Sequence, residues 1–521
     1  MQRRTFLASL TAAGGAAVLG CTPRPSPAYP EQSGAPFEGV GPFPSGVGSA
    51  DPTPSAVLLW TRAHPERDAG NGIQLRVELA TDPGFGTSTV WESTALATAA
   101  RDHCVTVDAT GLLPGTRYWY RFSYDGQTST VGRTRTAPQG GVEHMRIAAF
   151  SCQRWTQGWF TAHADLAALA DDPATDVDLV LSLGDYIYDT GFADKVYVPG
   201  REDPVQDALT LTDFRSKYRL YRSDPSLQAM HAAYPVVSIF DNHDGMDDPS
   251  DPQRAGALGA FFEHMPVRTA RPGRIDRSLR WGSMAEVFMT DQRSFRDPTL
   301  KEDGTLGTSA TARPEIFDPS RTMLGTEQRA WLLDGLGGST AKWKVVGSQL
   351  MFAPFRSFAR LPGQPVNGGV FFNLTQWDGY AAERAALLGR IAETGATNTL
   401  VLSGDSHFFA ASQMSLDIDD PNSRPLLVEL STGSMTSNNA DENSYPTDDY
   451  TWDWVRNANP NTLRYLETER HGYVVVDLTP TEMTAELRSP RTVLAPTSAA
   501  EVVGRFSCAS GTQRLESLPL T

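Results

Sequence analysis

The chain has 521 residues, with 45 Lys and Arg against 61 Asp and Glu, and a net charge of -16. This length exceeds what one hydrophobic core usually holds, so the sequence predicts at least two domains. Hydrophobic residues make up 40% and charged residues 20%, as in a globular protein, and the sequence has no basic tract, so we expect no nucleic-acid partner.

Residues 1–21 are typical of an export signal. A twin arginine at positions 3 and 4 precedes an apolar stretch from Phe6 to Gly20, which is too short to span a bilayer. This start predicts the Tat route, which exports folded proteins. The stretch ending at Cys21 resembles a lipoprotein cleavage box, although Leu19 is not the small residue usual there. We expect export by the Tat machinery to the periplasm, to the medium, or to the cell surface with a lipid anchor on Cys21.

Two segments precede the main domain. Residues 22–35 are rich in Pro and Ser and predict a linker. Residues 36–138 contain short alternating apolar runs separated by Gly, Pro and Asp turns, which predicts a β-sandwich. Its LLPGTRYWYRF segment resembles the tyrosine corner of immunoglobulin-like and fibronectin-like sandwiches. No polar cluster suited to catalysis falls here, so we expect a structural module, with binding of cell-wall material as the alternative.

Residues 139–495 alternate between strand-like and helical segments, which predicts an α/β domain. The expected strands are RIAAF, LVLSL, VVSIF, WKVVGS, TLVLSG and LLVELS. The expected helices are TEQRAWLLDGLGG, from a Thr cap to a Gly stop, and YAAERAALLGRIAETGA, with a Gly stop. HGYVVVDLTPTEMTAELRS predicts a hairpin that closes the sheet, and residues 496–521 are expected to form a C-terminal tail.

Cysteine is sparse, because only Cys104, Cys152 and Cys508 follow Cys21. Three residues do not make a disulfide framework. Cys104 and Cys508 either pair after export or are small buried hydrophobic residues. Cys152 is then an odd thiol that requires an explanation.

Four strand-like runs end in residues that bind cations or move protons. The runs are AAFSCQ, LVLSLGDYIYD, VVSIFDNHDGMDD and TLVLSGDSH. In open α/β sheets ligands bind beyond the carboxyl ends of the strands, so we expect these four ends to converge. The polar residues at the four ends are Cys152, Asp185, Tyr188, Asn242, His243, Asp405 and His407. The pattern predicts a metal site.

Each of these residue types suits a part of such a site. Asp185 has two carboxylate oxygens and can bridge two cations. A tyrosinate at Tyr188 is a hard donor suited to ferric iron, with aromatic packing as the alternative. Asn242 offers a neutral oxygen to a hard divalent ion. A metal lowers the pKa of a coordinated thiol, so Cys152 fits a trivalent metal, although a lone cysteine is more often buried packing.

His243 directly follows Asn242, where a general acid that protonates a leaving oxygen would lie. Asp244 is expected to orient its imidazole ring. The alternative is that the Asn-His-Asp run is only a turn that caps a helix.

The GDSH segment has a second interpretation. It resembles the nucleophile block of GDSL serine esterases, with Ser406 and His407 as the reactive pair. That block normally lies near the start of its domain, and the chain has no G-x-S-x-G elbow, so the metal interpretation is favoured. Only His243 and His407 of the nine histidines fall in the four clusters. Oxygen donors must therefore dominate, which favours iron, calcium or manganese over zinc.

These segments resemble the alkaline phosphatase D (PhoD) family of metallophosphoesterases. The similarity runs from about Pro36 to Arg488 and is carried by SCQRWTQGWFTAHADLA, LGDYIYD, TDFRSKYRLYRSDPSLQAMHAAYPVV, RTMLGTEQRAWLLDGL, WDGYAAER, LSGDSHFF and STGSMTSN. The resemblance implies a calcineurin-like αββα sandwich after a small immunoglobulin/fibronectin-like β-sandwich, Tat export, and hydrolysis of phosphomonoesters and phosphodiesters with ferric iron and calcium. It implies two ligand sets: Cys152, Asp185, Tyr188 and His407 for iron, and Asp185, Asn242 and Asp405 for calcium.

One departure from this family concerns the third strand end. The family usually carries D-D-H-E and an Asn-rich stretch, whereas residues 241–244 are Asp-Asn-His-Asp and are followed by GMDDPSD. The substrate preference therefore stays open.

We expect an exported, metal-dependent phosphoesterase that acts through a metal-activated hydroxide. His243 and Asp244 would serve proton transfer, and Arg293 would hold a non-bridging phosphoryl oxygen or form only a surface ion pair. Iron and calcium are the expected cofactors, with manganese or zinc as alternatives. The alternative functions are a serine esterase using Ser406 and His407, and a non-catalytic cell-surface binding protein.

Overall fold

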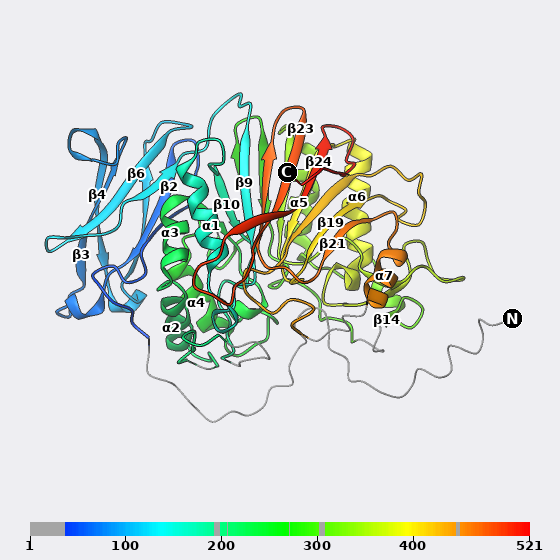
Figure 1. Ribbon diagram of the computed structural model, residues 1–521, viewed down its shortest axis with the longest axis horizontal. Helices are drawn as coiled ribbons and strands as arrows, with labels where there is room; N and C mark the ends of the chain where they lie inside the picture. Colours follow the sequence, from blue (N-terminus) through cyan, green and yellow to red (C-terminus); the bar gives the residue numbers. More distant parts are fainter. Residues whose placement is uncertain are drawn as a thin grey trace.

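The computed structural model describes residues 37–191, 198–205, 207–269, 271–301, 308–443 and 449–520. The expected export signal, including Cys21, and the expected linker lie outside these residues. Figure 1 shows a β-module at one end of the molecule and two large sheets, with helices on their outer sides, in the rest. Among the helices of the described residues, none has both the length and the apolar character that crossing a bilayer requires.

The N-terminal module is a sandwich of two antiparallel sheets with the strand orders β1-β2-β5 and β4-β3-β6-β7, and β8 pairs with β6. Its strands are β1 (Val47–Ala50), β2 (Ala56–Arg62), β3 (Ile73–Ala80), β4 (Thr89–Ala97), β5 (Cys104–Thr110), β6 (Arg117–Tyr124), β7 (Gln127–Thr128) and β8 (Gly132–Arg135). One apolar core includes Leu59 of the first sheet and Val77 of the second. The Tyr118 hydroxyl accepts a hydrogen bond from the Leu113 amide at 2.9 Å, which is the contact of a tyrosine corner.

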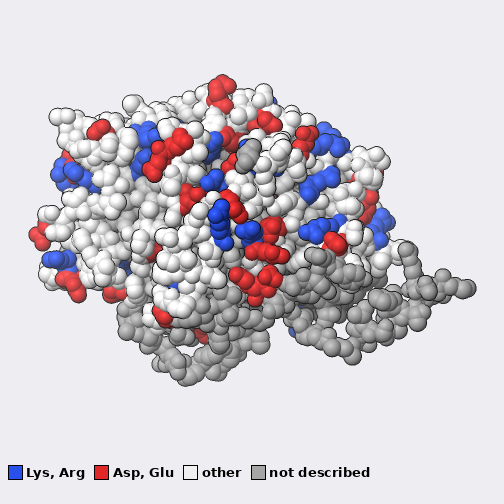
Figure 2. Space-filling view, viewed as in Figure 1, with Lys and Arg blue, Asp and Glu red and all other residues white. Residues whose placement is uncertain are grey.

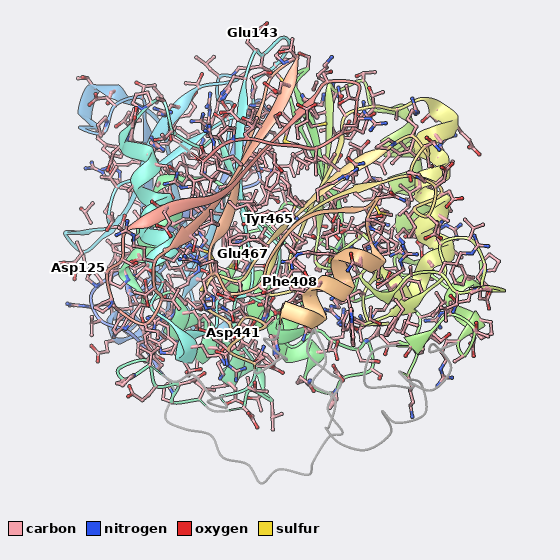
Figure 3. All side chains as sticks on the ribbon, turned by 45° about the vertical axis from the view of Figure 1, so that its right-hand side comes forward. Asp125, Glu143, Phe408, Asp441, Tyr465 and Glu467 are labelled. Atoms are coloured by element: carbon pink, nitrogen blue, oxygen red, sulfur yellow. The ribbon has the colours of Figure 1, made fainter. Side chains whose placement is uncertain are left out.

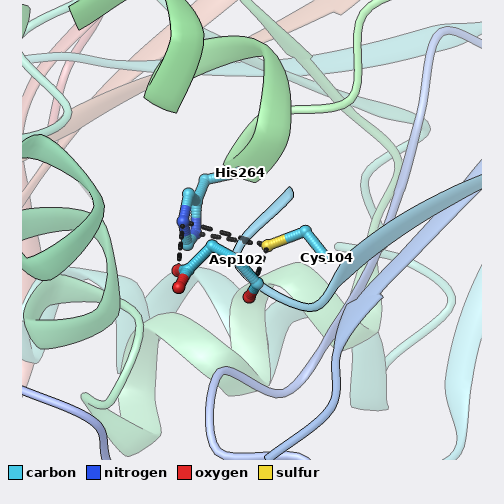
Figure 4. Close-up of side chains that lie close together, drawn as sticks. All are labelled: Asp102, Cys104 and His264. Atoms are coloured by element: carbon cyan, nitrogen blue, oxygen red, sulfur yellow. Dashed lines mark hydrogen bonds and ion pairs between the residues drawn. The ribbon is translucent and has the colours of Figure 1, made fainter. Parts of the chain in front are cut away.

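A buried polar cluster joins this module to the rest of the molecule (Figure 4). Asp102 pairs with Arg62 and Arg219, and its Oδ2 lies 3.0 Å from His264 Nε2. Cys104 Sγ lies 3.8 Å from the ring nitrogens of His264. Burial alone would raise the pKa of Asp102, but the contacts with His264, Arg62 and Arg219 lower it below its usual range. Because two guanidinium groups already neutralise Asp102, we interpret this cluster as a domain joint and not as a metal site.

The main domain contains two seven-stranded sheets and one small sheet. The first large sheet has the order β11-β10-β9-β22-β23-β24-β25 and the second the order β12-β13-β15-β18-β20-β19-β21. The strands of the first are β9 (Met145–Phe150), β10 (Leu179–Ser182), β11 (Val236–Ser238), β22 (Tyr473–Leu478), β23 (Glu482–Pro490), β24 (Ala500–Ala509) and β25 (Glu516–Ser517). Those of the second are β12 (Arg277–Trp281), β13 (Ala285–Met289), β15 (Trp343–Ser348), β18 (Thr399–Ser403), β19 (Phe409–Met414), β20 (Leu427–Thr432) and β21 (Leu463–Glu467). The small sheet contains β14 (Thr308–Ser309), β16 (Arg356–Phe358) and β17 (Val370–Phe371).

Parallel pairing within each large sheet directs several carboxyl ends to one edge. In the first sheet β9, β10 and β11 run parallel, and in the second β13, β15, β18 and β20 do. The strands predicted from the sequence are thus confirmed as β9, β10, β11, β15, β18 and β20. The largest apolar core contains residues of both sheets, such as Ile147 of β9 and Leu402 of β18. The two sheets therefore pack on each other, with the four polar strand ends at a shared edge.

Helices cover the outer faces of both sheets (Figure 1). The α-helices of the described residues are α1 (Thr161–Ala168), α2 (Leu211–Tyr221), α3 (Pro225–Ala233), α4 (Arg254–His264), α5 (Gly325–Gly338), α6 (Ala381–Thr394) and α7 (Asp449–Ala458), of which α7 packs on β16 of the small sheet. A second apolar core contains Leu332 of α5, Leu387 of α6 and Val401 of β18, so α5 and α6 lie on the second sheet. This αββα sandwich with a β-sandwich before it is the fold that the sequence predicted.

Two local predictions differ from the structure. The predicted Thr cap of α5 is wrong, because the helix begins at Gly325, whose amide donates to Thr322 Oγ1 at 2.8 Å. The expected tail, residues 496–521, instead contains β24, which pairs with β23 along its length and extends the first sheet. The Gly stop of α6 is confirmed, because Gly395 has a φ of +66°.

Cys104, Cys152 and Cys508 are all buried and free. Cys104 lies in the domain joint, whereas Cys508 lies on β24 and contacts its own neighbours. The alternative of two buried hydrophobic residues therefore holds for this pair. On the surface, acidic and basic side chains are interspersed over the face shown in Figure 2.

Candidate metal centre

The four strand ends bring the candidate ligands into two groups that share one residue. Cys152, Asp185 and His407 form the first group, which we call the sulfur side. Asp185, Asp241 and Asp405 form the second, the carboxylate side. Within each group the potential ligand atoms lie within 4.8 Å of one another. Asp185 belongs to both groups, as a bridging carboxylate would.

The backbone at these positions has an uncommon conformation. Cys152, Asp185, Asp405 and His407 have φ angles of 59°, 50°, 61° and 55°. Residues other than glycine rarely adopt this left-handed backbone conformation, and those that do concentrate at functional sites. Gly184, before Asp185, has a φ of +105°, and a Cβ placed on it would lie 2.4 Å from Asp241 Cβ. The chain thus makes a sharp turn directly after each of these strands, at the candidate ligand.

The sulfur side is built around Asp185 Oδ2. Cys152 Sγ lies 3.7 Å and Tyr188 Oη 3.2 Å from this oxygen. Tyr188 Oη also lies 3.4 Å from His407 Nε2. His407 Nδ1 lies 2.8 Å from the Asn438 carbonyl, which can only accept, so Nδ1 carries the hydrogen and Nε2 has a free lone pair. Burial lowers the pKa of His407 to about 4, which keeps the ring in the neutral, metal-binding form.

His407 is not paired with Ser406 as a serine esterase would require. Its two nitrogens face Asn438 and Tyr188. Within the ranges that the structure describes, no hydrogen bond joins the Ser406 hydroxyl to the ring. Phe408, the next residue, is labelled in Figure 3 and stacks on Phe355, so its ring takes no part in the site. The geometry therefore favours His407 as a ligand.

The carboxylate side contains a residue that sequence reasoning did not single out. Asp241 is buried, and its Oδ2 has no hydrogen-bond partner among the described residues. Burial, opposed by Arg293 and reinforced by the nearby Asp405, raises the pKa of Asp241 to about 6. Burial likewise raises the pKa of Asp185 well above its usual range. Three buried carboxyl groups at this spacing repel one another when ionised, so the group fits a bound cation.

Arg293 supplies positive charge inside the carboxylate side. Its guanidinium donates to Asp241, to Asn242 Oδ1 at 3.1 Å and to Asp405 Oδ1 at 3.2 Å. It also pairs with Asp247 at 3.2 Å. The expected alternative of a surface ion pair is wrong, because Arg293 is only 2% exposed. Its contacts are with candidate ligands, so we interpret it first as a counter-ion of the site.

Arg293→Gln is expected to make the protein depend more strongly on a divalent cation. Without the guanidinium, the carboxylates repel one another in the metal-free protein, so its unfolding temperature falls by several degrees, as for a loss of roughly 1–3 kcal/mol. Added calcium should then raise the unfolding temperature of the variant more than that of the wild type. Thermal unfolding measured in chelator and in calcium tests both effects. If calcium raised the unfolding temperature of the variant and of the wild type equally, the counter-ion role would be refuted.

His243 adjoins the two groups through its backbone amide, and its ring contacts Tyr188 and Asp189. Its amide donates to Asp185 Oδ1 at 2.9 Å, and its ring stacks on Tyr188 with centroids 4.2 Å apart. Its Nδ1 lies 2.9 Å from Asp189 Oδ1. The orienting role expected for Asp244 is wrong, because its two carboxylate oxygens accept from backbone amides, at 2.8 and 3.1 Å. Asp189, four residues after Asp185 in GDYIYD, is the residue that orients the ring.

The donor set fits metal binding. Together with Tyr188, the sulfur side offers a thiol, a phenol, an imidazole nitrogen and a carboxylate, and the first two suit iron. The carboxylate side, with Asn242, offers only oxygen, which suits calcium or another hard cation. The unpartnered Oδ2 of Asp241 is a buried acceptor of the kind that a cation satisfies.

Comparisons with known proteins agree on one family. The family described as "PhoD-like phosphatase" matches residues 147–487, and its N-terminal domain matches residues 31–138. The chain is 32% identical to alkaline phosphatase D of Bacillus subtilis (strain 168), over 94% of this chain and 84% of that protein. A solved structure titled "Structure of PhoD" superposes with a TM-score of 0.81 at 30% identity, over 95% of this chain and 94% of that one.

Proposed function

The chain belongs to the PhoD-like phosphatase family and is a phosphoesterase, and on this premise we propose that it is exported and uses ferric iron and calcium to hydrolyse phosphomonoesters or phosphodiesters. The observation that carries the metal proposal is the position of Asp185, which belongs to both groups of potential ligands. A single carboxylate with two oxygens can serve one cation on each side.

We propose Cys152, Asp185, Tyr188 and His407 as the residues that would hold iron. Calcium would be held by Asp185, Asn242 and Asp405, and the position of Asp241 adds it as a fourth candidate. Two bound cations supply charge neutralisation for a phosphoryl group and an acidified water as the nucleophile.

The chain's own side chains account for the proton that the leaving group needs. His243 would donate it from Nε2, because its Nδ1 faces Asp189. The Asp189 carboxylate fixes the ring orientation, and the stacking on Tyr188 restricts it further. Arg293, already bonded to Asp405 and Asn242, would hold those groups in place or turn to a phosphoryl oxygen.

Export is proposed from the first 21 residues, which lie outside the described structure. The twin arginine and the short apolar stretch support the Tat route, and Cys21 supports a lipid anchor. Export of a folded protein is compatible with loading iron at a buried site such as Cys152 before transport.

Removing the metals is expected to abolish activity and colour together. Ferric iron bound by tyrosinate or thiolate absorbs visible light, so the purified protein should be coloured. A chelator combined with a reductant should lower hydrolysis of a nitrophenyl phosphate ester by about 1,000-fold, the effect of a loss of several kcal/mol of transition-state stabilisation. Iron and calcium together should restore it. Elemental analysis provides the check: an active, colourless protein that contains only zinc or manganese would contradict the iron assignment.

A further inference from the structure

A buried segment after β20, residues 434–438, packs against the sulfur side. The amides of Thr436 and Ser437 donate to the Cys152 carbonyl, at 3.3 and 3.1 Å. The segment also supplies the carbonyl that holds His407 Nδ1. The segment therefore contacts Cys152 and His407, two candidate ligands of the sulfur side, without being a ligand itself. Residues in this position determine how the ligands of a metal are oriented.

The Ser437 hydroxyl points its hydrogen at Tyr188. The Arg154 amide donates to Ser437 Oγ at 3.2 Å, so this oxygen accepts there. Its own O–H is then available to Tyr188 Oη, 2.5 Å away. Ser437 is 1% exposed, so water does not compete for this contact. A hydroxyl has one hydrogen, and here it is committed to the phenol oxygen.

A chain of side chains that begins at the buried Ser434 holds Ser437 in place. Ser434 Oγ donates to the Ser437 carbonyl at 2.5 Å. The same oxygen lies 3.0 Å from His471 Nδ1, and His471 Nε2 lies 3.1 Å from Glu442 Oε2. The His471 ring therefore connects Ser434 to the Glu442 carboxylate. The position of the Ser437 hydroxyl is thus built into the fold.

We propose that Ser437 is a positioning residue that donates a hydrogen bond to the Tyr188 phenolate oxygen in the iron-loaded protein. The proposal rests on the iron ligation by Tyr188 put forward above. A donor to the phenolate oxygen stabilises its negative charge and fixes the ring for coordination. The visible band of such a site would arise from light-driven charge transfer from the phenolate to ferric iron. A hydrogen bond to the phenolate oxygen would raise the energy of this transition and so shorten its wavelength.

The visible absorption band of iron-loaded Ser437→Ala is expected to move to longer wavelength. Iron affinity should fall by about 10- to 100-fold, as when other second-layer partners of metal ligands are removed. Thr436→Val is the matched control, because the Thr436 hydroxyl belongs to the same segment but donates to the Arg154 carbonyl, at 2.8 Å. Its band should stay in place. Ser437→Cys keeps the side-chain shape with a weaker donor and serves if Ser437→Ala does not fold.

Each outcome bears on a different claim. A coloured wild type with an unshifted band in Ser437→Ala and Ser437→Cys overturns the role of Ser437 and leaves the proposed function intact. An equal shift in Thr436→Val also overturns it, because any disturbance of the segment would then suffice. An iron-loaded wild type without a tyrosinate band overturns both the ligation by Tyr188 and the role of Ser437.

Discussion

Asp185→Asn is expected to reduce hydrolysis of a nitrophenyl phosphate ester to the background rate. Asp185 is the one residue shared by the sulfur and carboxylate sides. Asparagine removes the negative charge and replaces one carboxylate oxygen by an amide nitrogen, which donates and cannot bind a cation. The loss of shared cation binding corresponds to several kcal/mol, or at least about 1,000-fold in rate.

The measurement pairs the rate constant with elemental analysis of the purified variant. Both iron and calcium should fall in Asp185→Asn, whereas circular dichroism should stay unchanged. Asp178→Asn is the matched control: Asp178 is also a buried carboxylate, but it accepts from the Arg146 amide, away from the centre. Substantial activity in Asp185→Asn, with a full metal content, would remove the basis of the two-cation proposal.

The sequence was most informative where a local pattern determines the outcome. Apolar runs followed by polar residues predict β9, β10, β11 and β18, and parallel pairing brings Cys152, Asp185 and Asn242 to one edge of the first sheet. Asp405 follows β18 of the second sheet, so the packing of the two sheets, which the strand pattern does not indicate, brings it to the same site.

Contacts between distant segments could not be predicted in the same way. Ser437 lies 249 residues from Tyr188, and nothing in its neighbours marks it as a partner of the phenol. The sequence offers Arg293 only as a holder of a phosphoryl oxygen or as a surface ion pair, and it does not predict the contacts of Arg293 with Asn242 and Asp405. Asp241 has no distinguishing signal in the sequence, because Asn242 and His243 beside it are the residue types with the more specific metal-binding and proton-transfer chemistry.

The position of Asp189 in the sequence does indicate that it lies near the candidate metal centre. It is the last residue of GDYIYD, four positions after the bridging Asp185, and it forms an acid–base pair with His243. The prediction of Asp244 rests only on its being adjacent to His243 in the sequence. Adjacent side chains diverge where a short helical turn follows a strand, and the Asp244 carboxylate instead caps the backbone of that turn.

His243→Gln is expected to show a loss of activity that depends on the leaving group. A general acid contributes about 10²- to 10⁴-fold when the departing oxygen must be protonated. 4-Nitrophenolate leaves as a stable anion and needs little help, whereas an alkyl alkoxide needs a proton. The rate on an alkyl phosphate ester should therefore fall by about 100-fold or more, and the rate on the nitrophenyl ester by much less.

Asp189→Asn should give the same pattern at a smaller amplitude, because the ring loses its orienting carboxylate and keeps its proton donor. The side-chain amide of asparagine can also turn its nitrogen toward Nδ1 and favour the wrong tautomer. His103→Gln is the matched control, since His103 Nε2 lies 2.9 Å from Asp68 Oδ2 in the β-module, far from the centre. A merely structural effect of Asp189→Asn would lower both rates by the same factor. Leaving-group dependence in His243→Gln and Asp189→Asn, absent from His103→Gln, would identify His243 as the proton donor and Asp189 as the residue that positions it.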